Sequence, residues 1–259
     1  MKTIVCVKQV PDSAAALTIE NGNVSLDDSS LVVNPWDEFA IEAALVQKGA
    51  HGGEVIALSI GPESAREALK VALAMGCSAA VLVSGTDLQP FDGQITARIL
   101  AAAIQKIGGA DLVIMGRQAI DADMGTTPAQ VARILGWPAL TLVSAISLLD
   151  PAARLIQIER AFEEGRQVLE SRLPAVISVV KDIGTPRFPS FMGIRSAQKA
   201  SIPIWSLADL GLTPIEPAVN CIEMIERPQP KVHTEMITGQ SPQEIAEVLV
   251  EKILAEKIL

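Results

Sequence analysis

A loop with the composition of a phosphate-binding site begins at Gly116 and ends at Pro128. Gly116 and Gly125 allow a ligand to approach the backbone closely, and Thr126 and Thr127 supply hydroxyls and amides. Pro128 favours the first turn of a helix, whose positive N-terminal end would face the same place. The loop contains neither GxxxxGK(S/T) nor GxGxxG. By residue type alone it is either an unconventional nucleotide loop or a strand-to-helix connection with Thr127 as the helix N-cap.

Two short acidic side chains, Asp121 and Asp123, lie in the same loop. A carboxylate pair could perform acid–base chemistry or bind Mg²⁺ together with phosphate oxygens. In tight loops, such residues more often accept hydrogen bonds from backbone amides or ribose hydroxyls. A second loop, Asn34-Pro35-Trp36-Asp37, precedes a helix and could join the same edge of a sheet. Asn34 could contact an adenine edge; alternatively, Asn34 and Pro35 form a turn and Asp37 caps the helix.

Composition narrows the class of protein that these loops serve. A chain of 259 residues, of which 49% are hydrophobic and 20% charged, can bury one sizeable core. The net charge of −9 disfavours nucleic acid as a partner. Cys6, Cys77 and Cys221 form no CxxC pair, and only His51 and His233 are available, so neither a metal site nor histidine catalysis is indicated. The apolar runs are shorter than the roughly 20 residues of a membrane span, and the N-terminus lacks a cleavage site, so we expect a cytoplasmic protein.

The elements that must position the loops alternate between strands and helices up to about residue 150. Short, β-rich apolar segments predict strands at Thr3–Lys8, Val55–Ile60, Ala80–Ser84, Leu112–Gly116 and Leu140–Ser144. Apolar residues at three-and-four spacing predict helices at Ala40–Lys48, Glu63–Met75, Gln94–Ile107 and Pro128–Leu135. This alternation predicts an α/β fold with a doubly wound, mostly parallel, Rossmann-like sheet, in which ligands bind beyond the carboxyl ends of the strands.

The later part of the chain has a different pattern. Two β-rich segments around Glu163-Glu164-Gly165 predict a hairpin, and Pro174–Lys181 predicts one more buried strand. We therefore expect a nucleotide-binding α/β domain at residues 1–182, followed at 183–259 by a proline-rich extended arm and a C-terminal helix. Ser241-Pro242-Gln243-Glu244 is a capping box at the start of that helix. The apolar stripe of the helix could fold back onto the chain's own sheet, but the long arm favours docking on another subunit.

Several motifs resemble the beta subunit of electron-transfer flavoproteins. They occur in the family's order and at its spacing from residue 1 to about residue 215, which makes the resemblance specific. The motifs are Val7-Lys8-Gln9-Val10-Pro11-Asp12, Asn34-Pro35-Trp36-Asp37-Glu38, Gly116-Arg117-Gln118-Ala119-Ile120-Asp121, Arg160-Ala161-Phe162-Glu163-Glu164-Gly165-Arg166-Gln167-Val168-Leu169 with Leu173-Pro174-Ala175-Val176, and Pro186-Arg187-Phe188-Pro189-Ser190. The resemblance implies an adenine nucleotide alpha hydrolase-like fold and a heterodimer with a larger alpha subunit, which holds the redox FAD.

The resemblance also implies that this subunit holds a structural AMP. Carried over by motif position, the AMP contacts are Cys6, Asn34, Pro35, Trp36, Asp37, Ile60, Gly116, Arg117, Gln118, Ala119, Ile120, Asp121, Ala122, Asp123, Met124, Gly125, Thr126 and Thr127. Most of them belong to the two loops already identified from their residue types. Two departures from the family concern contacts outside this site: Ala161 replaces an acidic residue found in many members, and Ser13 replaces an aromatic residue beside the flavin.

A partner-recognition loop is implied at Pro189–Lys199, where Phe191 takes the position of an apolar anchor for an acyl-CoA dehydrogenase. Apolar side chains alternate there with cationic ones such as Arg195, which is typical of interfaces. Alternatively, Phe188 and Phe191 cover the docking surface of the arm itself, a role that suits Phe188 better than Phe191. The implied function is electron relay in fatty acid oxidation, from an acyl-CoA or related dehydrogenase to a quinone oxidoreductase, with no catalytic site in this chain.

Two alternatives differ from this interpretation in the nucleotide. Electron-bifurcating members of the family bind a second FAD where AMP would lie. Thr127 favours AMP because bifurcating members resemble a valine-containing loop, whereas Ala122-Asp123-Met124-Gly125 matches neither type. The other alternative, a stand-alone ATP-binding or ATP-hydrolysing domain of related fold, needs a lysine loop and a metal cage that this sequence lacks.

Overall fold

The computed structural model describes residues 1–15, 18–20, 23–25, 31–85, 92–213, 217–219, 222, 225 and 234–256. Cys221 and His233 lie outside the described residues, as do Pro214, Pro228 and Pro230 of the predicted arm. The chain divides into two units, Met1–Met224 and Ile225–Leu259, which are described separately.

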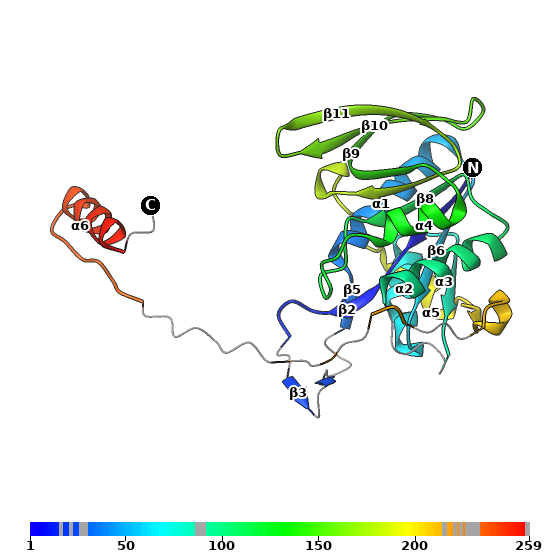
Figure 1. Cartoon of the computed structure of the whole chain (residues 1–259), viewed down its shortest axis with the longest axis horizontal. Coiled ribbons are helices and arrows are strands. Elements are labelled where there is room, and N and C mark those ends of the chain that lie inside the picture. Colours follow the sequence, from blue (N-terminus) through cyan, green and yellow to red (C-terminus); the bar gives the residue numbers. More distant parts are fainter. Residues whose placement is uncertain are drawn as a thin grey trace. The chain divides into compact units, whose positions relative to one another are not determined.

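A nine-stranded sheet crosses the first unit in the order β11-β10-β9-β12-β8-β1-β6-β7-β13 (Figure 1). Neighbours from β9 to β13 pair in parallel, and β10 and β11 add an antiparallel hairpin beyond β9. The strands are β1 Lys2–Cys6, β6 Glu54–Ile60, β7 Ala79–Val83, β8 Leu112–Gly116, β9 Ala139–Asp150, β10 Leu155–Phe162, β11 Gly165–Arg172, β12 Ala175–Val179 and β13 Ile204–Trp205. Two small antiparallel pairs accompany the sheet, β2 Gln9–Pro11 with β5 Leu31–Val33 and β3 Thr18–Glu20 with β4 Asn23–Ser25. The predicted doubly wound, mostly parallel sheet is confirmed.

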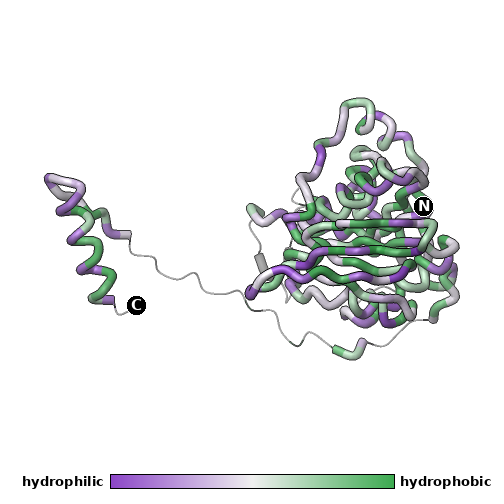
Figure 2. Tube along the Cα trace, turned by 90° about the horizontal axis from the view of Figure 1, so that it is seen from above, coloured by the Kyte–Doolittle hydropathy of each residue, from purple (hydrophilic) through white to green (hydrophobic). Residues whose placement is uncertain are grey.

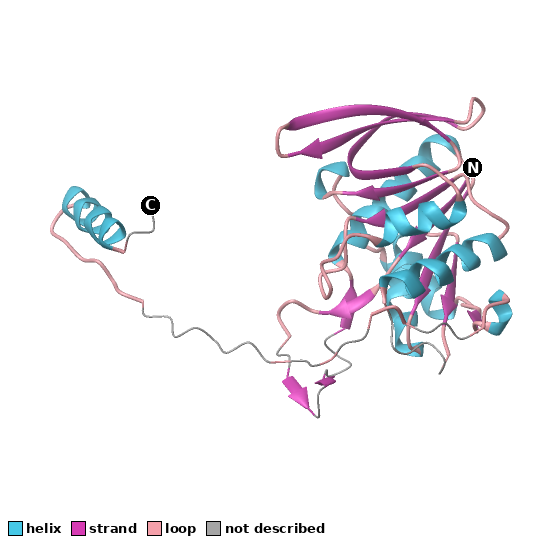
Figure 3. Cartoon of the chain, viewed as in Figure 1, coloured by secondary structure: helices cyan, strands magenta, loops and turns pink. Residues whose placement is uncertain are grey.

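Helices cover both faces of this sheet (Figure 3). The packing places α1 Pro35–His51 and α2 Arg66–Met75 on one face, and α3 Gly93–Lys106 and α4 Thr127–Leu135 on the other. Successive strand residues point to opposite faces, so Val5 joins the first layer and Ile4 joins the second. Figure 2 shows the hydrophobic residues running along the strands between these layers. Burial on both faces explains why β8 and β12 have continuous apolar sequences.

Three element ends differ from the prediction. Helix α1 begins at Pro35, with Asn34 at the N-cap position, so Asp37 lies inside the first turn and the predicted Asp37 cap is wrong. Helix α4 begins at Thr127 with Thr126 at the cap position, so the predicted Thr127 cap is wrong as well. Strand β9 continues to Asp150 because its second half pairs with β10, a long-range contact that the local sequence does not encode.

The predicted extended course after residue 183 does not hold between residues 191 and 210. Helix α5 Phe191–Lys199 begins after Ser190, whose Oγ accepts a hydrogen bond from the Gly193 N–H. Strand β13 follows Pro203 and pairs with β7 at the edge of the sheet. The prolines precede these two elements, where a missing N–H is tolerated, and so they do not prevent regular structure. The prediction of an extended arm is therefore wrong for these residues, because it took a high proline content as a sign of irregular chain.

The second unit contains helix α6 Pro242–Ala255. The predicted capping box is present in part: Ser241 Oγ accepts a hydrogen bond from the Glu244 N–H, and the Glu244 carboxylate accepts one from the Gln240 N–H. Leu249, Val250 and Leu254 are exposed within this unit. Among the helices that the structure describes, none is long and apolar enough to cross a membrane.

Candidate functional site

The predicted loops meet at the topological switch point of the sheet. The chain runs from β1 through α1 to β6 on one side of β1, and returns later to place β8 on its other side. Val5 lies beside Ile114 in the parallel β1–β8 pair, so the two strands end close together. Open α/β sheets bind ligands at the carboxyl ends of strands where the strand order reverses in this way.

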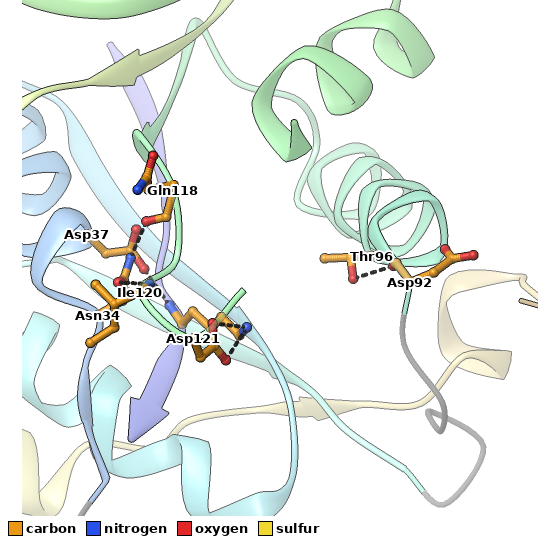
Figure 4. A network of polar contacts seen from close by, with 8 residues as sticks. Asn34, Asp37, Asp92, Thr96, Gln118, Ile120 and Asp121 are labelled. Atoms are coloured by element: carbon orange, nitrogen blue, oxygen red, sulfur yellow. Dashed lines mark hydrogen bonds and ion pairs between the residues drawn. The ribbon is translucent and has the colours of Figure 1, made fainter. Parts of the chain in front are cut away.

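Asn34 fastens the loop that follows β8 (Figure 4). Its side-chain Nδ2 donates to the Gln118 carbonyl at 2.9 Å, and its Oδ1 accepts from the Ile120 N–H at 3.2 Å. The residue is only 1% exposed. Both polar groups of the buried side chain are bonded to the loop backbone, and contact with an adenine edge stays a prediction. The structure therefore gives Asn34 the role of positioning the loop.

Asp37 joins the ends of β1 and β8 to the first turn of α1. Its Oδ2 accepts from the Lys8 N–H at 2.8 Å, and its Oδ1 accepts from the Gly116 N–H at 3.2 Å. Burial raises the pKa of Asp37 to about 7, although the hydrogen bonds from Lys8, Asn34 and Gly116 act in the opposite direction. A side chain at position 116 would meet Asp37 Oδ1 at 2.5 Å and the Trp36 carbonyl carbon at 2.7 Å, which explains the glycine there.

The loop from Gly116 to Thr127 is held by ion-pair and side-chain contacts as well. Lys8 Nζ lies 2.6 Å from Asp121 Oδ2, and Gln118 Nε2 donates to Asp123 Oδ1. Asp123 has φ 54, a left-handed conformation that suits aspartate in tight loops. The two aspartates therefore have separate partners and do not act as one carboxylate pair. Within the described part of the chain, no group of three or more His, Cys, Asp and Glu side chains is placed to hold a metal ion.

Cys6 and Ile60 lie at the ends of β1 and β6 on the face covered by α3 and α4. The first turns of these two helices lie close together on that face: a Cβ added to Gly93 would lie 3.8 Å from Thr126 Oγ1. The Asp92 carboxylate already accepts the Ile95 N–H at the start of α3. The start of α4, whose cap residue Thr126 makes no side-chain hydrogen bond to the helix, is therefore the one that favours an anion. Burial raises the pKa of the Cys6 thiol, and the Asp37 carboxylate raises it further, so Cys6 is a neutral group that can pack against a ligand.

The predicted partner-recognition residues occupy a separate surface on α5 and the segment before it. Phe188 is 94% exposed, Phe191 79% and Met192 69%. Neither Phe188 nor Phe191 is buried by the described residues of the first unit, and the alternative that they cover the arm's own docking surface stays a prediction. Arg195 is exposed on the same helix.

One feature near the switch point was missed by sequence reasoning. A cavity of about 940 Å³ lies between the tip of the β10–β11 hairpin and the start of α1, lined among others by Trp36, Arg117 and Leu142. The Arg117 guanidinium lies over the Trp36 ring, 5.7 Å from its centroid. Leu142 has φ 60, an unusual conformation for leucine, and marks the place where β9 changes partners. No local sequence pattern predicts a positive φ at a leucine.

Fold and site together define an α/β protein with the loop arrangement of a nucleotide-binding switch point. Residues 23–210 match the family model described as the electron transfer flavoprotein domain. The chain belongs to the beta-subunit family of electron-transfer flavoproteins. Members of this family are electron carriers associated with a flavin.

Relatives with different names match this chain over most of their length. The electron transfer flavoprotein subunit beta of Mycobacterium bovis is 35% identical over 99% of this chain and 98% of that protein. The caffeyl-CoA reductase-Etf complex subunit CarD of Acetobacterium woodii is 37% identical over the full length of both chains. Protein FixA of Azorhizobium caulinodans is 39% identical over 83% of this chain and 78% of its own.

Proposed function

We propose that this chain is the beta subunit of a heterodimeric electron-transfer flavoprotein that relays electrons from an acyl-CoA or related dehydrogenase to a quinone oxidoreductase. The alpha subunit holds the redox FAD, and this chain holds AMP and the donor's docking surface. The main support for the proposal is the loop from Gly116 to Thr127 at the switch point, which Asn34, Asp37 and Lys8 hold in place, in a chain that belongs to this family. The chain itself acts as a carrier subunit and not as an enzyme.

The loop geometry supports a permanently bound nucleotide. Asn34 holds the Gln118 and Ile120 backbone, Asp37 holds Gly116, and Lys8 holds Asp121. A loop fastened at several points loses little conformational freedom when a ligand binds, which favours tight binding. The start of α4 suits the AMP phosphate, and Cys6 and Ile60 suit contact with the rest of the nucleotide.

The exposed apolar surfaces support two protein partners. Phe191 stands at the start of α5 with its side chain largely free, next to the cationic Arg195, as an anchor for the donor dehydrogenase would. The apolar residues of α6, such as Leu249 and Leu254, are exposed within the second unit and suit docking on the alpha subunit.

Nucleotide release from the purified complex tests this function. Co-expression with a flavoprotein alpha subunit should yield a heterodimer, and denaturation should release one FAD and one AMP for each heterodimer. The complex should be reduced by an acyl-CoA dehydrogenase and reoxidised by a quinone oxidoreductase. A chain that purifies without an alpha subunit, or that releases no adenine nucleotide, would contradict the proposal.

A second candidate differs only in the nucleotide: an electron-bifurcating subunit with a second FAD in place of AMP. The observation in its favour is the full-length match to a subunit of a caffeyl-CoA reductase complex. The same release experiment separates the two, since this candidate predicts two FAD and no AMP. Thr127, at the start of α4, remains the residue in favour of AMP.

A further inference from the structure

Glu42, a buried residue of α1, binds the segment that leads to α5. Arg187 Nε donates to Glu42 Oε2 at 2.7 Å, and its second guanidinium nitrogen donates to Glu42 Oε1 at 2.8 Å. The Arg187 backbone N–H donates to Glu42 Oε2 as well, at 3.1 Å. The Glu42 side chain is only 11% exposed and that of Arg187 46%. The contact therefore fixes both the side chain and the backbone of position 187.

The pair has the geometry of a selective contact. Two parallel N–H···O bonds between a guanidinium and a carboxylate restrict both groups to one plane and one separation. The Arg187 hydrogen bonds hold the pKa of Glu42 below its usual range, in spite of its burial, so Glu42 is ionised when it holds Arg187. A point charge such as lysine could replace the charge of Arg187 but not this geometry.

A second fixed point, Gly193, lies in the first turn of α5. A Cβ added to Gly193 would meet the Ala74 carbonyl oxygen at 2.3 Å, so α5 rests directly on the last turn of α2. Ser190 Oγ accepts the Gly193 N–H at 3.0 Å and sets the start of the helix. After the helix, Arg66 donates to the Ile202 carbonyl at 3.3 Å. The segment is thus attached before, within and after α5.

Between the first two attachment points lie the most exposed apolar side chains of the segment, Phe188 and Phe191. Apolar groups that remain in water contribute no burial energy to the order of their own segment. The order of this segment comes instead from the contact of Arg187 with Glu42, the close packing of Gly193 on Ala74 and the burial of Ala197. Those contacts fix the backbone that carries the two aromatic side chains.

We propose that Glu42 and Arg187 are positioning residues for partner recognition, which hold residues 187–192 in the conformation that a partner protein binds. The inference rests on the proposed function, because the partner is the donor dehydrogenase. A preformed segment loses less conformational entropy on docking, so the pair strengthens association without touching the partner or the nucleotides.

The test uses the intact heterodimer with its bound nucleotides and an acyl-CoA dehydrogenase as donor. The variants are Glu42→Gln, Arg187→Gln, Arg187→Lys and the double variant Glu42→Gln with Arg187→Gln. Glu67→Gln is the matched control, because it removes the same charge from an exposed ion pair with Lys70 on α2, the helix that carries α5. The measured quantities are kcat and KM of the dehydrogenase for the flavoprotein.

We expect KM to rise about tenfold in the single variants with little change in kcat, since the loss of a charged hydrogen-bond pair affects association and not electron transfer. The double variant should be no worse than either single variant, because the two residues act as one unit. Arg187→Lys should restore little of the loss, and Glu67→Gln should match the unmodified complex. Amide hydrogen exchange of residues 187–199 should become faster in the same variants.

The outcomes separate the inference from the function on which it rests. A complex that is reduced normally, with the KM of Arg187→Gln and of the double variant unchanged, overturns the positioning role alone. A change of kcat without a change of KM overturns it as well. An unmodified complex that no acyl-CoA dehydrogenase reduces overturns the proposed function together with this inference. The double variant keeps the test valid if Glu42→Gln alone does not assemble, since it leaves no unpaired charge.

Discussion

Asp37 and Gly116 show how closely the switch point is packed at the scale of single residues. The carboxylate of Asp37 receives backbone N–H groups from two strand ends, and Gly116 leaves room for it. Burial opposes the ionised form of Asp37, while the same hydrogen bonds favour it. The balance raises the pKa of Asp37 to about 7.

Asp37 should make the stability of the chain depend on pH. Its pKa is about 7 in the folded chain and about 3.9 when unfolded. Between these values the folded state binds more protons, so the free energy of unfolding falls as pH rises from about 4 to about 7. Chemical denaturation should show that the free energy of unfolding of the unmodified protein is about 1–3 kcal/mol lower at about pH 8 than at about pH 5. The Asp37→Asn variant should lack this difference. Equal pH dependence in both proteins would contradict the raised pKa.

Gly116→Ala should destabilise the first unit. The new Cβ would lie 2.5 Å from Asp37 Oδ1 and 2.7 Å from the Trp36 carbonyl carbon, so α1 would have to move. Overpacking of this kind costs about 1–3 kcal/mol, measurable by denaturation. Gly49→Ala is the control, because Gly49 lies in α1 with nothing within 4 Å of its added Cβ. That substitution should be neutral or stabilising by about 0.5–1 kcal/mol, and a similar loss in both would refute the steric argument.

At the scale of elements, helix starts organise the site. Helices α3 and α4 begin side by side, and α1 begins where its first turn can reach both β1 and β8. Asp92 caps α3 through the Ile95 N–H at 2.7 Å, and its other oxygen accepts the Ala218 N–H at 2.7 Å. The pKa of Asp92 is lowered, chiefly by the Ile95 hydrogen bond. One carboxylate therefore links a helix start to a segment 126 positions away.

Asp92→Ala should lose the cap of α3 and the contact with Ala218 together. The expected loss is about 1 kcal/mol in the free energy of unfolding, measured by denaturation of the assembled protein. Asp92→Asn should keep most of the stability, because asparagine caps helices as well as aspartate does. If the alanine variant were as stable as the asparagine variant, the cap would not contribute to the stability of the fold.

At the scale of the whole molecule, the two units have different roles in the proposed function. The first unit contains the sheet, the nucleotide loops and α5, and the second contains α6 with its exposed apolar residues. An amphipathic helix of this length is marginal by itself and gains stability by docking. The alpha subunit is the partner that the proposed function supplies.

Deletion from Thr234 onward should weaken subunit association while the first unit stays folded and retains its nucleotide, because the deletion removes only residues of the second unit. Analytical ultracentrifugation of the deletion variant should show dissociation into subunits at lower concentration. Replacing Leu249 and Leu254 by serine tests the apolar face alone, since the chain keeps its length. A truncated chain that assembles with unchanged affinity would exclude α6 as a docking element.

The parts of this structure that could be predicted are those with a local physical signal. Continuous apolar runs predicted β8 and β12, and the Ser241 capping box predicted the start of α6. Helix α5 was missed because its short sequence follows prolines that usually mark irregular chain. The start of α1 was placed too late, because Pro35 and Trp36 break the apolar periodicity that marks the rest of the helix.

By itself, the sequence determined the alternation of strands and helices, the doubly wound class of fold and the loops where a ligand would bind, since periodicity, glycines and helix-start residues act over a few positions. Only the tertiary structure decided which residues meet there. Asn34 fastens a loop 84 to 86 positions away, and Glu42 holds Arg187 across 145 positions. No local pattern encodes such pairs, because they form only when the sheet brings its strand ends and helices together.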